Sequence, residues 1–271
     1  MAAAQESRRG ATSVNESPRA GMEKHMQPTT SYIICSTARS GSTFLCHTLR
    51  KTGVAGYPDE FFEKAHFARW CDTWGVSAFD DEYVAKAIEA ATTPNGVCGV
   101  KIHMEGFYEH FVRNLAELPR FRGRGLSAHA MLAELFPNLH YIWITRRDKV
   151  RQAVSLWRAT ETGQWVWKRL EPTASPREYN FKQIDANVAG FVLQEAKWQD
   201  YFTEAGVRPP TVVYEDFASD YEQTVWRLLR HLGLEGQSDE KWPRPWMRKQ
   251  ADEESERWVR RYHEDKRREL A

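Results

Sequence analysis

Four short apolar segments alternate with segments of helical periodicity, and this alternation restricts the chain to a small set of α/β folds. The segments expected as strands are Tyr32–Ser36, Val97–His103, His140–Thr145 and Thr211–Tyr214. Because helices separate them, the strands are expected to pair in parallel through right-handed crossovers. The sequence therefore predicts one α/β domain over residues 29–271, with a central parallel β-sheet flanked by helices.

The expected helices follow from apolar spacing and from end signals. A helix over 42–52 follows the first strand and ends at Gly53, a typical C-terminal cap. Ser219 and Glu222 have the spacing of a capping box at the start of another helix. The other expected helices are Asp148–Thr160 with Val150, Val154 and Trp157 on one face, Asp185–Ala205 with Val188, Val192 and Tyr201 on its apolar side, and Ser255–Arg268.

Composition limits the classes of partner. The 271 residues carry 38 Lys and Arg against 37 Asp and Glu, a net charge of +1. This balance argues against a general nucleic-acid coat, so basic residues are expected to act locally. No apolar run approaches the roughly 20 residues that a membrane-spanning helix needs, so we expect no integral membrane association.

Residues 1–28 have no apolar periodicity and lack the apolar centre of a signal peptide, so we expect a disordered tail or a start-site extension. The segment 162–182, dense in Trp, Pro and charge, is expected to be an insertion or a lid. Four cysteines follow no zinc or redox spacing, and Cys35 and Cys98 fall in expected strands, where buried free thiols are usual. A reducing cytoplasm is the expected location.

The loop 37–43 between the first strand and the first helix has the composition of an anion site. Helix starts present backbone N–H groups without partners and carry positive potential. Gly41 permits close backbone approach, and Arg39 adds a permanent charge with a planar donor fork. The lysine of the nucleoside-triphosphate loop is missing after Gly41. The loop predicts a phosphate or sulfate site, the alternative being an ordinary turn that caps the helix.

A second basic cluster follows the third expected strand. Arg146 and Arg147 end that strand, and Ser155 lies on the next helix, eight residues beyond Arg147. Eight residues are about two helical turns, so both side chains can face one ligand. Open parallel sheets bind ligands at the carboxyl ends of their strands. A solvated helix start is the alternative, but two arginines there oppose the helix dipole.

Together these segments resemble the sulfotransferase superfamily, whose donor is 3′-phosphoadenosine-5′-phosphosulfate (PAPS). The segments "ARSGST", "TGVAGYPDEFF", "TPNGVCGVKIHM", "QAVSLWRA" and "QADEESERWVRRY" are more narrowly similar to the bacterial trehalose 2-sulfotransferase family, over roughly residues 31–263. The strand-end segment "VVYEDF" also resembles that of the superfamily. The resemblance implies a P-loop-like sulfotransferase fold and sulfuryl transfer from PAPS to an alcohol, with no metal required.

The resemblance also implies which residues bind the donor. Residues 36–43 look like the 5′-phosphosulfate loop, and Arg39 is expected to neutralise charge on the leaving phosphate. Of the two adjacent arginines, we favour Arg146 as the 3′-phosphate ligand because it ends the strand directly, with Arg147 as the alternative. The full expected donor set is Arg39, Ser40, Gly41, Ser42, Thr43, Arg146, Arg147, Ser155, Arg248 and Lys249.

On the acceptor side, the resemblance to "P-x-E-F-F" implies Glu60 as the general base. Phe61 and Phe62 are expected to desolvate Glu60 and raise its pKa towards the working pH. A glutamate exposed in a surface turn is the alternative. Asp59 and Glu63 are nearby competitors for the role of base, and His47, His66 and His103 are alternatives that the motif does not favour. The expected acceptor-binding residues are Ala38, Tyr57, Pro58, Asp59, Glu60, Phe61, Phe62, Glu63 and Lys101.

The acceptor itself is predicted less sharply than the donor. Ala38 stands where a glutamine would suit a sugar hydroxyl, and its side chain makes no hydrogen bond. Tyr57 and Asp59 replace more extended polar side chains, and Tyr57 with Trp165 and Trp167 suits an apolar or aromatic acceptor equally well. A carbohydrate such as trehalose or a glycolipid precursor is the expected class. Lys101 either faces the sulfuryl group or is simply solvated.

Two other functions compete with this interpretation. A nucleotide or small-molecule kinase would share the fold, but the missing loop lysine argues against it. A non-catalytic nucleotide-binding protein would not need Arg39, Glu60 and Ser155 together. The C-terminal helix is expected to pack beside the segment of Arg248 and Lys249 or to support a homodimer.

Overall fold

The computed structural model describes residues 27–163, 165, 178–235 and 253–271. Nearly all of the expected tail at 1–28 and most of the expected insertion at 162–182 lie outside the described residues. Trp167, Arg248 and Lys249 lie outside them as well.

The sheet has four parallel strands in the order β2-β1-β3-β4. The strands are β1 (Thr30–Ser36), β2 (Val97–His103), β3 (Leu139–Thr145) and β4 (Thr211–Val213). The prediction of four parallel strands is confirmed, although β4 ends one residue early because Tyr214 already begins a helix. Cys35 of β1 lies level with Ile102 of β2 and with Trp143 of β3, so the loops after these strands leave the same edge.

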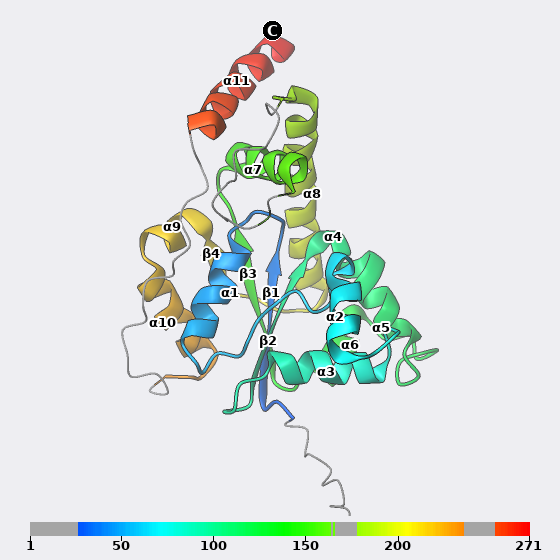
Figure 1. Cartoon of the computed structure of the whole chain (residues 1–271). Coiled ribbons are helices and arrows are strands. Elements are labelled where there is room, and N and C mark those ends of the chain that lie inside the picture. Colours follow the sequence, from blue (N-terminus) through cyan, green and yellow to red (C-terminus); the bar gives the residue numbers. More distant parts are fainter. Residues whose placement is uncertain (1–26, 164, 166–177, 236–252) are drawn as a thin grey trace, which may run out of the picture.

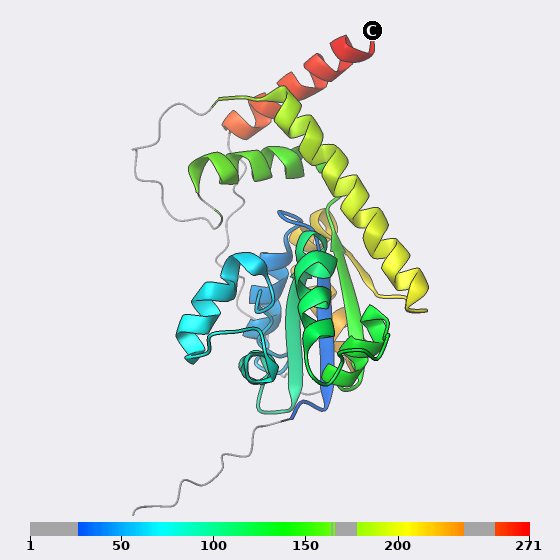
Figure 2. The same ribbon diagram turned by 90° about the vertical axis from the view of Figure 1, so that its right-hand side faces the viewer.

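Helices cover both faces of the sheet (Figures 1 and 2). Tyr32 and Ile34 of β1 point into one apolar cluster, while Ile33 and Cys35 point into another, as the two-residue period of a strand requires. The first cluster contains side chains of α1 (Ser42–Lys51), α9 (Tyr214–Ser219) and α10 (Tyr221–His231). The second contains side chains of α3 (Asp81–Ala91), α5 (Arg113–Glu117), α6 (Ala128–Leu135) and α8 (Phe181–Glu204). The predicted α/β domain is thereby confirmed.

A third apolar cluster lies beyond the carboxyl edge of the sheet. It joins α7 (Lys149–Thr162), the first half of α8 and α11 (Glu253–Leu270) through buried side chains such as Val154, Phe191 and Trp258. Figure 1 shows α7 and α11 above the strand ends. The C-terminal helix thus packs on α7 and α8, whereas its role in a homodimer stays a prediction.

The remaining helical segments connect the sheet to its covering layer. A 3₁₀ turn, η1 (Lys64–His66), leads into α2 (Phe67–Trp74). After β2 the chain runs through α4 (Met104–Gly106) and a π-helical segment, η2 (Phe107–Val112), into α5.

Several expectations about the helices are wrong in detail. α10 is capped by Asp220, whose side chain accepts from the Gln223 N–H, while the Ser219 hydroxyl donates to the Asp216 carbonyl at the end of α9. A capping box at Ser219 does not form because the short α9 already uses that residue. α8 begins at Phe181 rather than Asp185, and Val192 is 55% exposed instead of lying on the apolar side.

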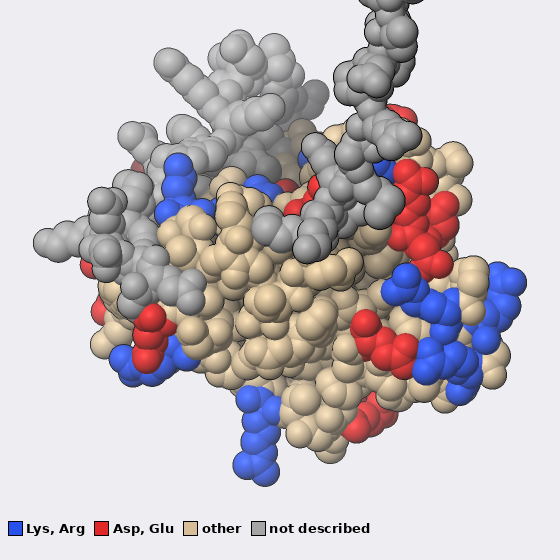
Figure 3. All heavy atoms as spheres, turned by 90° about the horizontal axis from the view of Figure 1, so that it is seen from below, with Lys and Arg blue, Asp and Glu red and all other residues tan. Residues whose placement is uncertain are grey.

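The cysteine prediction is confirmed: Cys35 and Cys98 are buried free thiols. In the described part of the chain, no helix combines the length and apolarity that crossing a membrane would take. Seen from the amino edge of the sheet, basic and acidic side chains lie beside one another (Figure 3). Surface ion pairs of the described residues include Arg120–Asp81 and Arg124–Glu134, both 2.8 Å.

Candidate active site

The loop after β1 turns sharply into α1. Gly41 precedes the helix with φ of 91°, and a Cβ atom there would lie 2.3 Å from Cδ2 of Tyr214. Only glycine fits both the backbone angle and the close approach of the ring. Arg39 has a φ of 60°, which is rare for a side chain of its size. No side chain of the described residues caps α1, so its first-turn N–H groups are available to a ligand at the carboxyl edge of the sheet.

A buried glutamine on α7 holds the start of this loop. Gln152 Nε2 donates to Thr37 Oγ1 over 2.8 Å and to the Ala38 carbonyl over 2.7 Å. Next to these residues, Ser40 is fully buried, and its hydroxyl has no hydrogen-bond partner among the described residues. Buried hydroxyls are nearly always satisfied, so this one suits a ligand that the loop would receive.

The side chain of Arg39 reaches from the loop to α7. Its Nε donates to Ser155 Oγ over 2.9 Å, and its Nη1 donates to the Trp165 carbonyl over 2.6 Å. Burial, together with the nearby charge of Arg146, lowers the pKa of Arg39 to about 10. The structure thus brings Arg39 and Ser155 together across 116 positions of sequence. Two close, half-buried guanidinium groups favour an anion beside them.

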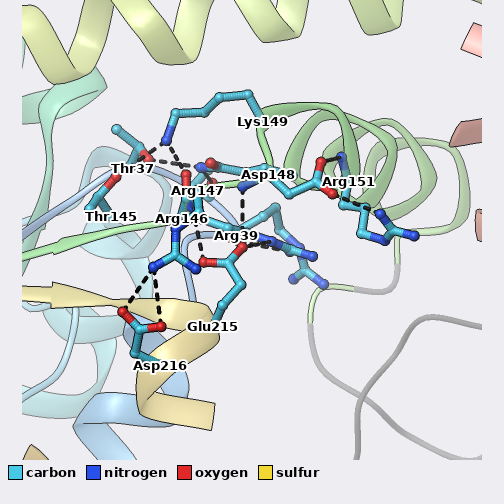
Figure 4. A network of polar contacts seen from close by, with 12 residues as sticks. Thr37, Arg39, Thr145, Arg146, Arg147, Asp148, Lys149, Arg151, Glu215 and Asp216 are labelled. Carbon is cyan, nitrogen blue, oxygen red and sulfur yellow. Dashed lines mark hydrogen bonds and ion pairs between the residues drawn. The ribbon is translucent and has the colours of Figure 1, made fainter. Parts of the chain in front are cut away.

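The two arginines after β3 point in different directions (Figure 4). Arg146 is 12% exposed, donates from Nη1 to the Arg39 carbonyl over 3.4 Å, and lies over the Tyr214 ring at 4.8 Å from its centroid. Its buried Nε makes no hydrogen bond within the described part of the chain, the Glu215 carboxylate being 3.9 Å away. Arg147 is 63% exposed and pairs with Asp216 at 2.9 Å. Arg146 therefore faces the loop, and Arg147 faces away from it.

Ion pairs fix α7 relative to its neighbours. Asp148 caps α7 and pairs with Arg151 at 2.7 Å, and Arg151 also pairs with Glu256 of α11. Lys149 pairs with Glu195 of α8 at 2.7 Å. These pairs hold the helix that carries Ser155 and Gln152, so the groups around the loop are preorganised.

On the other side of β1, Glu60 is the centre of a charged cluster. Its Oε1 lies 2.6 Å from Lys101 Nζ and 3.0 Å from His103 Nε2, and its Oε2 lies 2.6 Å from His66 Nε2. Lys101 is only 3% exposed and also donates to Thr43 Oγ1 over 3.1 Å. Lys101 is therefore not a solvated strand-end lysine, because it joins Glu60 to the first turn of α1.

The expected rise in the pKa of Glu60 is wrong. Burial by itself would raise this pKa, but hydrogen bonds from His103 and His66 and the charge of Lys101 hold it well below its usual range. Glu60 is consequently an ionised carboxylate throughout the neutral pH range.

The other predicted acceptor residues differ in their exposure and in their contacts. Tyr57 is 38% exposed, whereas Pro58 is buried and Ala38 packs against the cluster of α7, α8 and α11. Asp59 pairs with Arg50 at 3.2 Å and accepts from the Glu60 N–H. These contacts hold the backbone of the segment in place.

Three of those predicted acceptor residues have structural contacts instead. The Phe61 ring lies tilted against that of Trp70, with centroids 4.9 Å apart, and Phe62 stacks on Phe111 at 4.5 Å. Glu63 accepts from the His103 N–H over 2.6 Å, and burial raises its pKa. The rings of Phe61 and Phe62 are enclosed by the core, so their assignment to acceptor binding stays a prediction without a side-chain contact to support it.

Sequence reasoning missed two residues that shape the site. Gln152 holds the loop backbone, and Tyr214 packs on both Gly41 and Arg146. A polar residue three positions before Ser155 on the same helix was the available signal for Gln152. Across residues 27–163, 165, 178–235 and 253–271, no three His, Cys, Asp or Glu side chains gather in a way that would hold a metal ion.

Comparison with known proteins agrees with this geometry. The family model described as Stf0 sulphotransferase matches residues 31–265. A protein named trehalose 2-sulfotransferase from Mycolicibacterium smegmatis is 32% identical over 262 residues, which cover 87% of this chain and 95% of that protein. A protein of the same name from Mycobacterium tuberculosis is 29% identical over 255 residues, covering 85% of this chain and 93% of the relative.

Proposed function

Since this chain belongs to the Stf0 sulphotransferase family, we propose that it transfers a sulfuryl group from PAPS to a hydroxyl group of a sugar. The observation that carries the proposal is the approach of Arg146 to Arg39 of the loop 37–43, beside the Ser40 hydroxyl, which has no hydrogen-bond partner among the described residues. Family membership makes the chain a sulfotransferase, so the kinase and the non-catalytic alternatives are set aside. The identities of the donor and the acceptor are the proposed part.

The residues around the loop fit a phosphosulfate donor. The first-turn N–H groups of α1, with Ser40, Ser42 and Thr43, would hold the 5′-phosphosulfate. Arg146, with Ser155, would hold the 3′-phosphate, while Arg39 would neutralise charge on the leaving phosphate. The half-buried guanidinium groups would favour a ligand with several negative charges. Arg248 and Lys249 stay predicted ligands of the 3′-phosphate.

Glu60 would act as the base on the acceptor side. An alcohol that attacks sulfur loses its proton as the oxygen–sulfur bond forms and the bond from sulfur to the phosphate oxygen breaks. Lys101, between Thr43 and Glu60, places the carboxylate next to the first turn of α1 that the donor would occupy. This position supports proton acceptance by Glu60 despite its lowered pKa, because a fixed carboxylate close to the attacking oxygen needs no reorganisation.

A sugar acceptor is proposed from the relatives, both named for trehalose. The described part of the site adds polar and half-exposed groups that can bind hydroxyls, notably Tyr57, Asp59 and His66. We also propose a location in the cytoplasm, because the cysteines follow no zinc or redox spacing, and a homodimer that the C-terminal helix would support.

Two measurements test the proposal. Calorimetry should show that adenosine 3′,5′-bisphosphate binds without Mg²⁺ and more tightly than ATP does with Mg²⁺. Purified protein with sulfur-labelled PAPS should label trehalose or a related sugar in a panel that also contains phenols and lipid alcohols. Tighter binding of Mg²⁺-ATP would refute the donor, and labelling of phenols alone would refute the sugar acceptor.

A further inference from the structure

The two oxygens of the Glu60 carboxylate lie in different surroundings. Oε1 faces Lys101, which is 3% exposed, and His103, which is 17% exposed. Among the described residues, the partner of Oε2 is His66, whose side chain is 36% exposed. An acceptor hydroxyl arriving from solvent would therefore reach Oε2 and would compete there with the His66 ring.

His66 is held in place by its own backbone. It ends the 3₁₀ turn η1, and its N–H donates to the Glu63 carbonyl over 2.9 Å. The adjoining α2 is tied to the same segment, since Trp70 Nε1 donates to the Glu60 carbonyl over 3.1 Å. The 2.6 Å contact between His66 and Glu60 is thus a fixed part of the fold rather than a chance surface encounter.

We propose that His66 is a positioning residue for Glu60. Its Nε2 orients the Glu60 carboxylate, and when His66 releases its own proton to solvent, Oε2 of Glu60 becomes free to take the proton of the acceptor. The proposal rests on the proposed function. While His66 is an imidazolium, its N–H occupies Oε2 and its charge weakens the base. Once His66 is neutral, the acceptor O–H can donate its proton to Oε2 while the bond between the acceptor oxygen and sulfur forms. The bond between sulfur and the phosphate oxygen breaks, and its electron pair stays on the leaving phosphate.

The same contact returns the proton after transfer. A protonated Oε2 lies next to the neutral ring nitrogen of His66, so the proton passes from Glu60 to Nε2 and restores the ion pair. The half-exposed ring then loses a proton to water. One proton leaves the acceptor and one reaches solvent in each cycle, with no other reactant involved.

The charged groups around His66 act in both directions. Glu60 and Asp59 favour the imidazolium, whereas Arg69 of α2 disfavours it. Around Glu60 stand Lys101 and His103 from the end of β2, and Glu63 from the preceding segment. The hydrogen bond to Glu60 dominates, and the pKa of His66 is raised above 6.5. Because the active form is the neutral one, activity should rise with pH through this raised value.

The first test is the pH dependence of kcat/KM for the acceptor at saturating PAPS. In the unaltered enzyme, kcat/KM should fall about tenfold for each pH unit below the His66 pKa. In His66→Gln, an amide still donates to Oε2 but has no proton to release at these pH values, so this limb should disappear. Lys64→Gln, an exposed neighbour in the same turn, should keep the original profile.

Two further readouts separate positioning from mere structural support. Added imidazole should restore activity to His66→Ala in a pH-dependent way, with the affinity for adenosine 3′,5′-bisphosphate unchanged. By nuclear magnetic resonance, the pKa of His66 should fall towards about 6.5 in Glu60→Gln. An unchanged acid limb in His66→Gln, or an unchanged His66 titration in Glu60→Gln, would overturn the inference. If no sugar accepted a sulfuryl group, the proposed function would be refuted instead. The titration of His66 by nuclear magnetic resonance would still decide whether His66 and Glu60 interact.

Discussion

Replacing Gly41 by alanine should damage both stability and donor binding. Gly41 has a φ of 91°, and a left-handed conformation costs a residue with a Cβ about 1–2 kcal/mol. The new Cβ would also lie 2.3 Å from the Tyr214 ring, and such overpacking typically costs about 1–3 kcal/mol. Alanine restricts the unfolded chain, which offsets about 0.4–1 kcal/mol. We therefore expect a net loss of about 2–4 kcal/mol in the free energy of unfolding.

Gly53 offers a matched control for this substitution. Its φ is 72°, but nothing lies within 4 Å of a Cβ built there. Gly53→Ala should therefore lose only about 1 kcal/mol, the left-handed cost less the unfolded-state gain. The difference between the two variants isolates the contact with Tyr214.

Urea unfolding followed by circular dichroism measures the stabilities, and calorimetry with adenosine 3′,5′-bisphosphate measures donor affinity. A displaced Tyr214 ring disturbs Arg146, which lies 4.8 Å from its centroid, so Gly41→Ala should bind the nucleotide at least about tenfold more weakly. Gly53→Ala should bind it normally. Equal destabilisation by both substitutions, or normal binding by Gly41→Ala, would refute the close approach as the reason for glycine.

Three other substitutions test the roles of single side chains. Arg146→Ala should weaken nucleotide binding by about 1.5–3 kcal/mol, whereas the exposed Arg147→Ala should change it little; the reverse order in calorimetry would contradict the assignment. Ser155→Ala should weaken nucleotide binding by about 1–3 kcal/mol, measured in the same way, because a hydroxyl between Arg39 and the ligand is lost. Glu60→Gln should lower kcat by about 10²–10⁴ with little change in donor affinity, and a near-normal kcat would exclude Glu60 as the base.

The fold was predictable because its signals are local. The apolar runs of the strands, the helical spacing of Val150, Val154 and Trp157, and the end signal at Gly53 all depend on neighbours within a few residues. The errors arose where two elements compete for one residue. Ser219 serves the end of α9, so Asp220 caps α10 instead, and spacing alone does not distinguish these arrangements.

The candidate site was predictable only in part. Arg39, Ser155 and Arg146 were expected near one ligand, and the structure brings them together at the carboxyl edge of the sheet. The difference between Arg146 and Arg147 depends on Asp216 and Tyr214, which lie some 70 positions later in the chain. Phe61 and Phe62 looked like acceptor residues beside Glu60, yet both belong to the core, because the direction of a side chain in an irregular segment depends on what packs above it.

By itself, the sequence determined the parallel sheet, the glycine-containing loop, the basic cluster after the third strand and the family. These properties depend on residue order and on short-range spacing, which the chain carries before it folds. Only the tertiary structure decided how acidic Glu60 is, which of its oxygens faces solvent, and that Lys101 is buried between Glu60 and Thr43. Electrostatic environment depends on burial and on distances between residues far apart in sequence, so it arises only when β1, β2 and α1 meet at one edge.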